Sequence, residues 1–148
     1  MNKLLIKQLS ILSALLGGIL GLLALIPIVR NIAALVLMVL LAPIVIIYLK
    51  KLNLIDEVSL QNGAISGVIC GVVSVVAFFI VFAPLVLLFG IWIKNGYIGW
   101  IASLIKSAGF FVSCLMLFFI GLLSGLMNAF SGLTTAYVYE MLKKVKDW

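Results

Sequence analysis

The sequence lacks histidine altogether and contains only four acidic residues among its 148. Histidine is the commonest general base and the commonest metal ligand, and aspartate and glutamate carry much of the remaining acid–base chemistry. Without these side chains most catalytic and metal-binding arrangements are excluded, and no nucleotide-binding loop is evident either. We therefore expect a protein that is not an enzyme and that holds neither a cofactor nor a metal ion.

Charge of either sign is also scarce. Charged residues make up 9% of the chain, against roughly 25% in an ordinary soluble domain. Apolar residues make up 66%, and the mean hydropathy is +1.43. A soluble core of this size would need a polar shell, and the chain has too few polar residues to form one. The composition therefore predicts an integral membrane protein.

The net charge of +6 does not indicate a nucleic-acid partner. The basic residues flank apolar runs instead of sharing one polar face. Residues in such positions orient a chain in the membrane and favour anionic lipid headgroups. We expect membrane lipids as partners and no nucleic acid.

Only two cysteines occur, Cys70 and Cys114, and they lie in separate apolar runs without CxxC spacing. In the topology set out below, the two thiols would sit at different depths of the membrane, which argues against a disulfide. We predict two small thiols buried in the membrane, with a redox pair as the alternative.

Four apolar runs predict four membrane spans, at about 9–29, 32–49, 63–89 and 108–135. Arg30 and Asn31 alone separate the first two runs, which as one helix would be about 60 Å long, or twice the hydrocarbon thickness. These runs must form a hairpin, with Pro27 loosening the end of the first helix. The polar residues 50–62 are expected to form a cytoplasmic loop. The predicted fold is all-α, a single domain over 1–148: an integral membrane four-helix bundle made of two like-oriented helical hairpins.

The third run continues to about Ile93, beyond the length of one upright span, and Pro84 or Gly90 offers a kink or an end. Residues 97–107 allow two interpretations, an interfacial segment or part of the fourth helix. A lysine at mid-membrane would cost roughly 2.5–3.5 kcal/mol on insertion scales. Lys106 is therefore expected near the outer headgroups under either interpretation.

The basic residues predict that both termini are cytoplasmic. Seven of them flank the spans on that side, against three on the other. The seven are Lys3, Lys7, Lys50, Lys51, Lys143, Lys144 and Lys146, and the three are Arg30, Lys94 and Lys106. The tryptophans and tyrosines fall near the predicted span boundaries, where amphipathic rings prefer the headgroup level. The expected location is the cell membrane.

Small residues form stripes on three of the predicted spans, and in lipid such residues let helix backbones approach closely. The predicted helix-packing residues are Gly17, Gly21, Gly63, Gly67, Gly71, Gly121, Gly125, Asn128 and Gly132. In the predicted topology the stripes all lie in the cytoplasmic half. We therefore expect the closest approach there, and a wider outer half filled by phenylalanine side chains, lipid tails or a cavity. The stripes suit packing within one chain or, alternatively, contact with another copy or another membrane subunit.

Asn128 is the most polar side chain well inside a predicted span. An interhelical hydrogen bond, worth about 1 kcal/mol in a membrane, is the expected role. Contact with a ligand or an ion is the alternative. If Asn128 has this packing role, substituting Asn128→Leu should change the stability of the bundle, and an unchanged stability would exclude the role.

These features favour a small multi-pass membrane protein that acts as an accessory or assembly subunit through helix packing. The alternative is a small transporter or a pore-forming, holin-like oligomer. No acidic residue lies within a predicted span, and proton-coupled transporters usually need one. The subunit and the pore differ in whether the protein makes liposomes leak.

Overall fold

The chain forms an all-α bundle in a computed structural model that describes residues 3–52, 54 and 59–146, with the backbone alone for 144–146. The expected loop over 50–62, with its acidic residues, falls partly outside the described residues. The helices are α1 (Lys3–Leu23), α2 (Arg30–Leu35), the π-helical η1 (Val36–Leu40), α3 (Leu41–Lys51), α4 (Leu60–Trp92) and α5 (Gly96–Lys146). Since α2, η1 and α3 follow one another without a break, residues 30–51 are called the α2–α3 rod below.

Four helical segments within the described residues, called rods below, are long and apolar enough to cross a membrane. They are α1, the α2–α3 rod, α4 and α5, so the protein is a small multi-pass membrane protein. Large apolar side chains are exposed along all four rods. Because lipid and not water surrounds membrane helices, these side chains contact lipid, and their exposure is expected.

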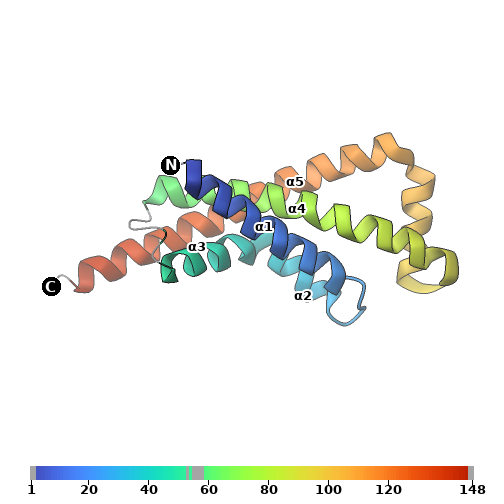
Figure 1. The fold of residues 1–148 in the computed structure, drawn as a ribbon, viewed down its shortest axis with the longest axis horizontal. Helices are drawn as coiled ribbons and strands as arrows, with labels where there is room; N and C mark the ends of the chain where they lie inside the picture. The colour runs from blue at the N-terminus through green and yellow to red at the C-terminus, as the bar shows by residue number, and fades with distance from the viewer. Residues whose placement is uncertain (1–2, 53, 55–58, 147–148) are drawn as a thin grey trace.

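The rods form two helical hairpins that point the same way (Figure 1). The start of α1, the end of α3, the start of α4 and the end of α5 lie at one end, called the terminal end below. The turns from α1 to α2 and from α4 to α5 lie toward the other, called the hairpin end. Helix α4 packs along both α1 and α5, and η1 and α3 pack against α4 and α5. This is the predicted four-helix bundle of like-oriented hairpins.

The helices do not begin and end where the apolar runs do. Helix α1 spans residues 3–23, six residues earlier at each end than the predicted span 9–29. Nothing in residues 3–8 prevents a helix from continuing into water, whereas residues 24–29, with Pro27, form turns. Helix α4 continues through Pro84 and Gly90 to Trp92. Pro84 lacks an N–H, but a membrane helix tolerates this loss where neighbouring groups satisfy the freed carbonyl.

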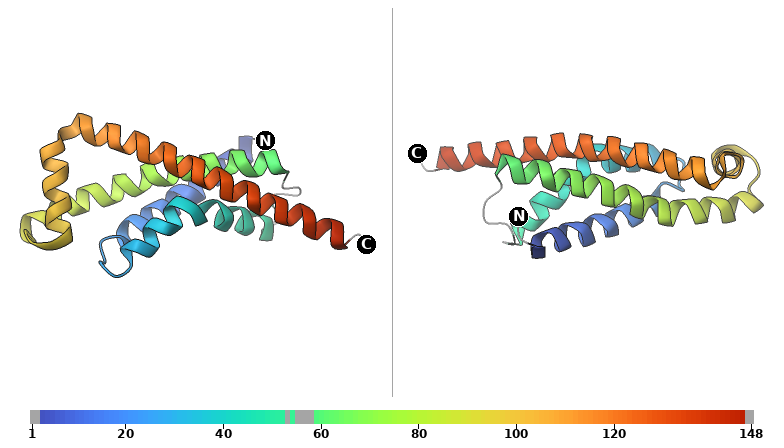
Figure 2. Two further views of the ribbon diagram at one scale, coloured as in Figure 1. Left: turned by 180° about the vertical axis from the view of Figure 1, so that it is seen from behind. Right: turned by 90° about the horizontal axis from the view of Figure 1, so that it is seen from above.

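Helix α5 consists of two parts that meet at Gly109. This glycine has φ 71° and ψ 172°, a backbone conformation essentially restricted to glycine. The part before it, residues 96–108, runs across the hairpin end and is seen nearly end-on in the right-hand view of Figure 2. Residues 97–107 are thus helical and set at an angle to the second part of α5, which runs from Gly109 to the terminal end.

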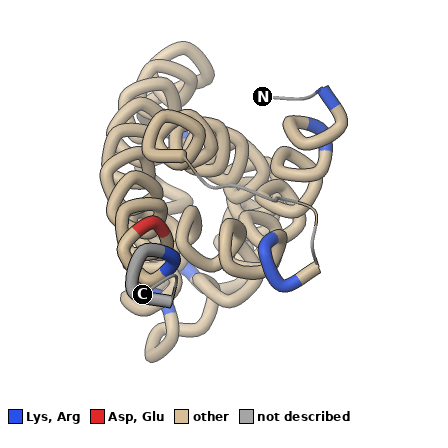
Figure 3. The backbone as a smooth tube through the Cα atoms, turned by 90° about the vertical axis from the view of Figure 1, so that its left-hand side faces the viewer, with Lys and Arg blue, Asp and Glu red and all other residues tan. Residues whose placement is uncertain are grey.

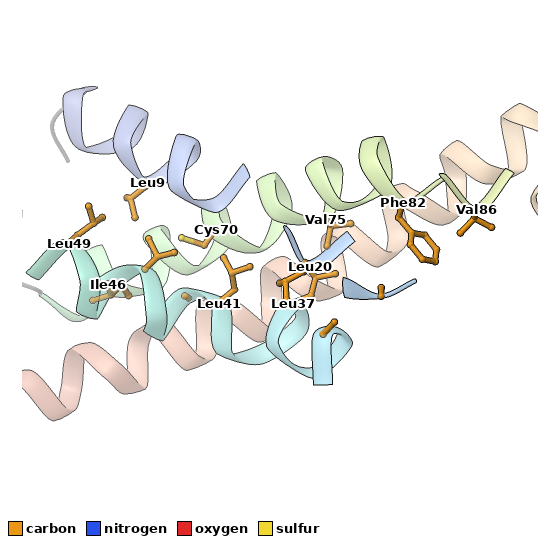
Figure 4. Close-up of a cluster of buried hydrophobic side chains, with 14 of the residues drawn as sticks. Leu9, Leu20, Leu37, Leu41, Ile46, Leu49, Cys70, Val75, Phe82 and Val86 are labelled. Carbon is orange, nitrogen blue, oxygen red and sulfur yellow. The ribbon is translucent and has the colours of Figure 1, made fainter. Parts of the chain in front are cut away.

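The buried hydrophobic cluster is centred on the α2–α3 rod (Figure 4). Leu41, Val45 and Ile46 of this rod are fully buried, and Leu9 of α1 and Val75 of α4 pack into the same cluster. Toward the hairpin end α4 and α5 separate (Figures 1 and 2). The separation agrees with the expectation that one half of the bundle is wider than the other.

Candidate functional site

Asn128 of α5 lies fully buried against the α2–α3 rod and forms hydrogen bonds to its backbone. Its Oδ1 accepts a hydrogen bond from the N–H of Ala42 at 2.9 Å. Its Nδ2 donates to the carbonyl oxygens of Leu37 and Met38, each at 3.0 Å. The carboxamide therefore binds one backbone donor and two backbone acceptors of the α2–α3 rod, and its Nδ2 also lies 3.0 Å from the carbonyl oxygen of Ser124.

The backbone groups that Asn128 binds lie at the π-helical turn η1 and the residues just after it. Pro43 follows this turn, has no N–H and would clash with the carbonyl of Val39 in a regular α-helix. A π turn widens the helix by one residue and leaves backbone groups without their usual partners. In lipid these groups must be satisfied by protein atoms. Asn128 supplies the partners from the neighbouring helix.

Ser124 lies one turn before Asn128 on the same face of α5 and joins three rods. Its hydroxyl lies 3.2 Å from the carbonyl oxygen of Leu37 and 3.3 Å from that of Gly71 on α4. Ser74, also on α4, donates to the same Gly71 carbonyl at 3.0 Å. The bond from Ser74 lies within α4, whereas Ser124 and Asn128 link α5 to its neighbouring helices.

Three glycines of α4 make this arrangement possible by allowing α5 to approach. A Cβ atom added to Gly71 would lie 2.5 Å from the carbonyl oxygen of Ser124. One added to Gly63 would lie 2.7 Å from that of Gly132, and one added to Gly67 would collide with the backbone of Asn128. Any side chain at these positions would force the two backbones apart.

The remaining predicted packing residues fall into three groups. On α1, Gly17 lies against the backbone of Ser74, and a Cβ at Gly21 would lie 3.0 Å from the carbonyl oxygen of Phe78. On α5, a Cβ at Gly132 would lie 2.5 Å from the carbonyl oxygen of Gly63, and one at Gly125 would lie 3.1 Å from the side chain of Val72 and 3.7 Å from the carbonyl oxygen of Val68. Gly121 differs, because a Cβ there would make ordinary contact with Val75 at 3.9 Å.

Sequence reasoning did not single out Pro43, the π turn or their relation to Asn128. A proline in the middle of an apolar run, together with Ser124 and Asn128 four residues apart on another, is the signal that points to such a junction.

Cys70 is buried and Cys114 is exposed, and both thiols are free. The described residues contain no group of three or more metal-ligating side chains.

A groove with a volume of about 730 Å³ runs beside this junction, between the α2–α3 rod and α5. Pro43 and Ile47 line one wall. Ser131, Thr134 and Thr135 line the other, together with Phe130. The groove is open to the side of the bundle that lipid would occupy, so it is accessible to another membrane component.

Comparison with known proteins gives no match: no protein-family model, no curated protein and no solved structure is significantly similar to this chain.

Proposed function

We propose that this chain is a non-enzymatic accessory or assembly subunit of the cell membrane that receives a transmembrane helix of a partner protein. The groove between the α2–α3 rod and α5 is the observation that carries this proposal, because it is open to lipid and its mostly apolar lining includes the hydroxyl-bearing side chains of Ser131, Thr134 and Thr135. Lipid tails alone require no hydroxyls, whereas helix–helix contacts in membranes are rich in serine and threonine.

The hydroxyl groups of the groove already donate to carbonyl oxygens of their own helix. Ser131 donates to Asn128 at 3.1 Å, Thr134 to Phe130 at 2.9 Å and Thr135 to Ser131 at 2.8 Å. Their donors are thus satisfied without a partner, and their compact side chains leave room for a second backbone. Phe130, which lines the groove and is 76% exposed, would pack against the partner helix.

The proposed orientation places both termini in the cytoplasm. Figure 3 looks onto the terminal end, where basic residues lie at the ends of α1, α3 and α5. Lys3 and Lys7 belong to α1, and Lys50 and Lys51 form the last turn of α3. This distribution supports the orientation through the positive-inside rule. A reporter fused to the C-terminus should be active only in a cytoplasmic form, and activity of an extracytoplasmic reporter would contradict the orientation.

A pore or transporter is the competing function. A water-filled pore needs polar side chains along one exposed helix face. In this bundle Ser124 and Asn128 are fully buried, and the exposed α5 residues between them are Leu126 and Met127. Purified protein in liposomes should therefore leave an entrapped dye inside. Dye release that increases with protein concentration would favour the pore and contradict the subunit.

Site-specific photocrosslinking tests the groove directly. Ile47 lines it and is 49% exposed, whereas Ile44 on the same helix does not line it and is 43% exposed. A photoreactive residue at Ile47 should give one discrete protein adduct in native membranes, and the same residue at Ile44 should not. An adduct with the mass of two copies would identify a homo-oligomer. Equal labelling from both positions would show that the groove selects no partner.

A further inference from the structure

A second cavity lies at the hairpin end, on a different part of the bundle from the groove. Its volume is about 690 Å³, within the range of roughly 300–1,000 Å³ typical of ligand pockets. The side chains of Phe78, Phe79 and Phe82 form its apolar interior. The rings of Phe78 and Phe82 stack with their centroids 5.0 Å apart, and Phe82 is only 6% exposed. The interior can therefore accept a hydrocarbon chain.

Another part of the cavity lining is polar and carries a positive charge. Arg30 and Asn31 line it from the start of the α2–α3 rod, and Tyr97 and Trp100 line it from the first part of α5. The Arg30 guanidinium carbon lies 4.3 Å from the centre of the Tyr97 ring. This cation–π contact holds the charge beside the cavity without neutralising it.

Arg30 makes no ion pair among the described residues. Glu140, the only carboxylate side chain that the structure describes, lies near the terminal end of α5. The guanidinium is thus a cation beside an apolar cavity, with donors in a planar fork that matches a phosphate group. Tyrosine and tryptophan are the residues that membrane proteins place at the headgroup level. The lining of this cavity thus combines one positive charge, two aromatic side chains of the headgroup type and a group of apolar side chains.

We propose that this cavity binds one anionic phospholipid, with its phosphate on Arg30 and an acyl chain along Phe78, Phe79 and Phe82. A single charged headgroup on a hydrocarbon chain is the chemistry that matches both sides of the cavity. The site goes beyond the assembly role proposed above and does not depend on it, since none of its lining residues belongs to the groove between the α2–α3 rod and α5.

Fluorescence quenching by brominated lipids tests the proposal with the full chain. Replacing Trp92→Phe and Trp148→Phe leaves Trp100, a lining residue, as the only tryptophan. The protein is placed in vesicles with the same composition in both leaflets, so the result does not depend on orientation. Brominated phosphatidylglycerol should quench Trp100 at about tenfold lower content than brominated phosphatidylcholine. Both lipids carry the phosphate, but the choline cation beside the phosphate of phosphatidylcholine is repelled by the positive charge of Arg30.

Four variants distinguish the charge of the side chain, its position and the space in the cavity. Arg30→Gln should abolish the preference for phosphatidylglycerol, whereas Lys94→Gln, which removes an exposed positive charge at the same end but outside the cavity, should preserve it. Ala34→Phe, which narrows the cavity and leaves Arg30 in place, should reduce quenching by either lipid. Circular dichroism and gel filtration establish that each variant is folded, and Arg30→Lys should retain a partial preference because it keeps the charge.

Several outcomes would overturn the proposal. Equal quenching by the two lipids would show that no headgroup is selected, and equal effects of Arg30→Gln and Lys94→Gln would reduce the preference to surface charge. Inorganic phosphate should not compete at the concentration of the lipid phosphate, because it lacks the acyl chain. Competition by phosphate would show that Arg30 binds a free anion and not a lipid.

Discussion

The two halves of the bundle are built from similarly apolar helices and yet pack differently. From the terminal end to the level of Gly121, the backbones of α4 and α5 touch through Gly63, Gly67 and Gly71. Toward the hairpin end the same two helices separate (Figure 1), and the side chains of Phe118 and Phe119 are 64% and 60% exposed. Lipid provides little hydrophobic force between helices. The comparison therefore teaches that side-chain size, and not hydrophobicity, decides which half closes.

The largest expected effect comes from enlarging a glycine in the closed half. Gly71→Ala should lower the free energy of unfolding by about 2–3 kcal/mol, as expected when overpacking forces a backbone shift, because the new methyl group would meet the Ser124 carbonyl. Gly121→Ala is the matched control on the boundary between the halves and should change stability by less than about 0.5 kcal/mol. Unfolding by sodium dodecyl sulfate in mixed micelles measures both. Equal losses would contradict the role of close approach.

A smaller effect is expected from removing the polar link. Asn128→Leu leaves the Ala42 N–H and two carbonyl oxygens without the partners they have here. We expect a loss of about 1–2 kcal/mol in the same unfolding assay, between the values measured for membrane hydrogen bonds and the cost of a buried unsatisfied group. Ser131→Ala, which removes a hydroxyl bonded within its own helix, is the control and should be nearly neutral. An unchanged stability of Asn128→Leu would remove the packing role.

The link between Asn128 and the π turn can be separated from packing by a double-mutant cycle. Pro43→Ala restores an N–H, so the α2–α3 rod can close its own hydrogen bonds. Asn128→Leu should therefore cost about 0.5–1 kcal/mol less in the Pro43→Ala background than in the wild-type chain. Additive effects of the two substitutions would show that Asn128 does not compensate for the π turn.

The smallest effect is expected in the open half. Phe118→Ala removes a large side chain that is mostly exposed to lipid, so the free energy of unfolding should change by less than about 0.5 kcal/mol. Phe82→Ala is the contrasting variant, because Phe82 is buried beside the cavity and stacked on Phe78. A loss from Phe118→Ala as large as that from Phe82→Ala would show that the open half is more tightly packed than the structure indicates.

The number of rods and their pairing into hairpins follow from the lengths of the apolar runs and the short break at Arg30-Asn31. The helix ends cannot be predicted in this way, because hydropathy indicates only which residues contact lipid. The backbone can remain helical beyond those residues. Helix α1 begins at Lys3 for this reason. The angle of residues 96–108 depends on the conformation of Gly109, which the sequence leaves open since glycine also fits a regular helix.

The candidate site was only partly predictable. Small residues at helical spacing pointed to the faces of α1, α4 and α5, and the structure places Gly67 and Gly71 against Asn128 and Ser124. The groups on the α2–α3 rod that Asn128 and Ser124 bind could not be predicted, because they are backbone groups, which every residue type has. They become available only where Pro43 and the π turn disturb the helix. The contact of Arg30 with Tyr97 likewise joins residues whose proximity only the folded chain determines.

The part of α5 before Gly109 acts as a spacer at the hairpin end. Residues 96–108 form a helix about 20 Å long at 1.5 Å per residue, and it lies across the bundle instead of along it. The width of the opening is therefore limited by a length of chain, and not by how well side chains fill it. Evolution could widen or narrow this mouth by adding or deleting single helical turns, while the closely packed half at the other end kept its geometry.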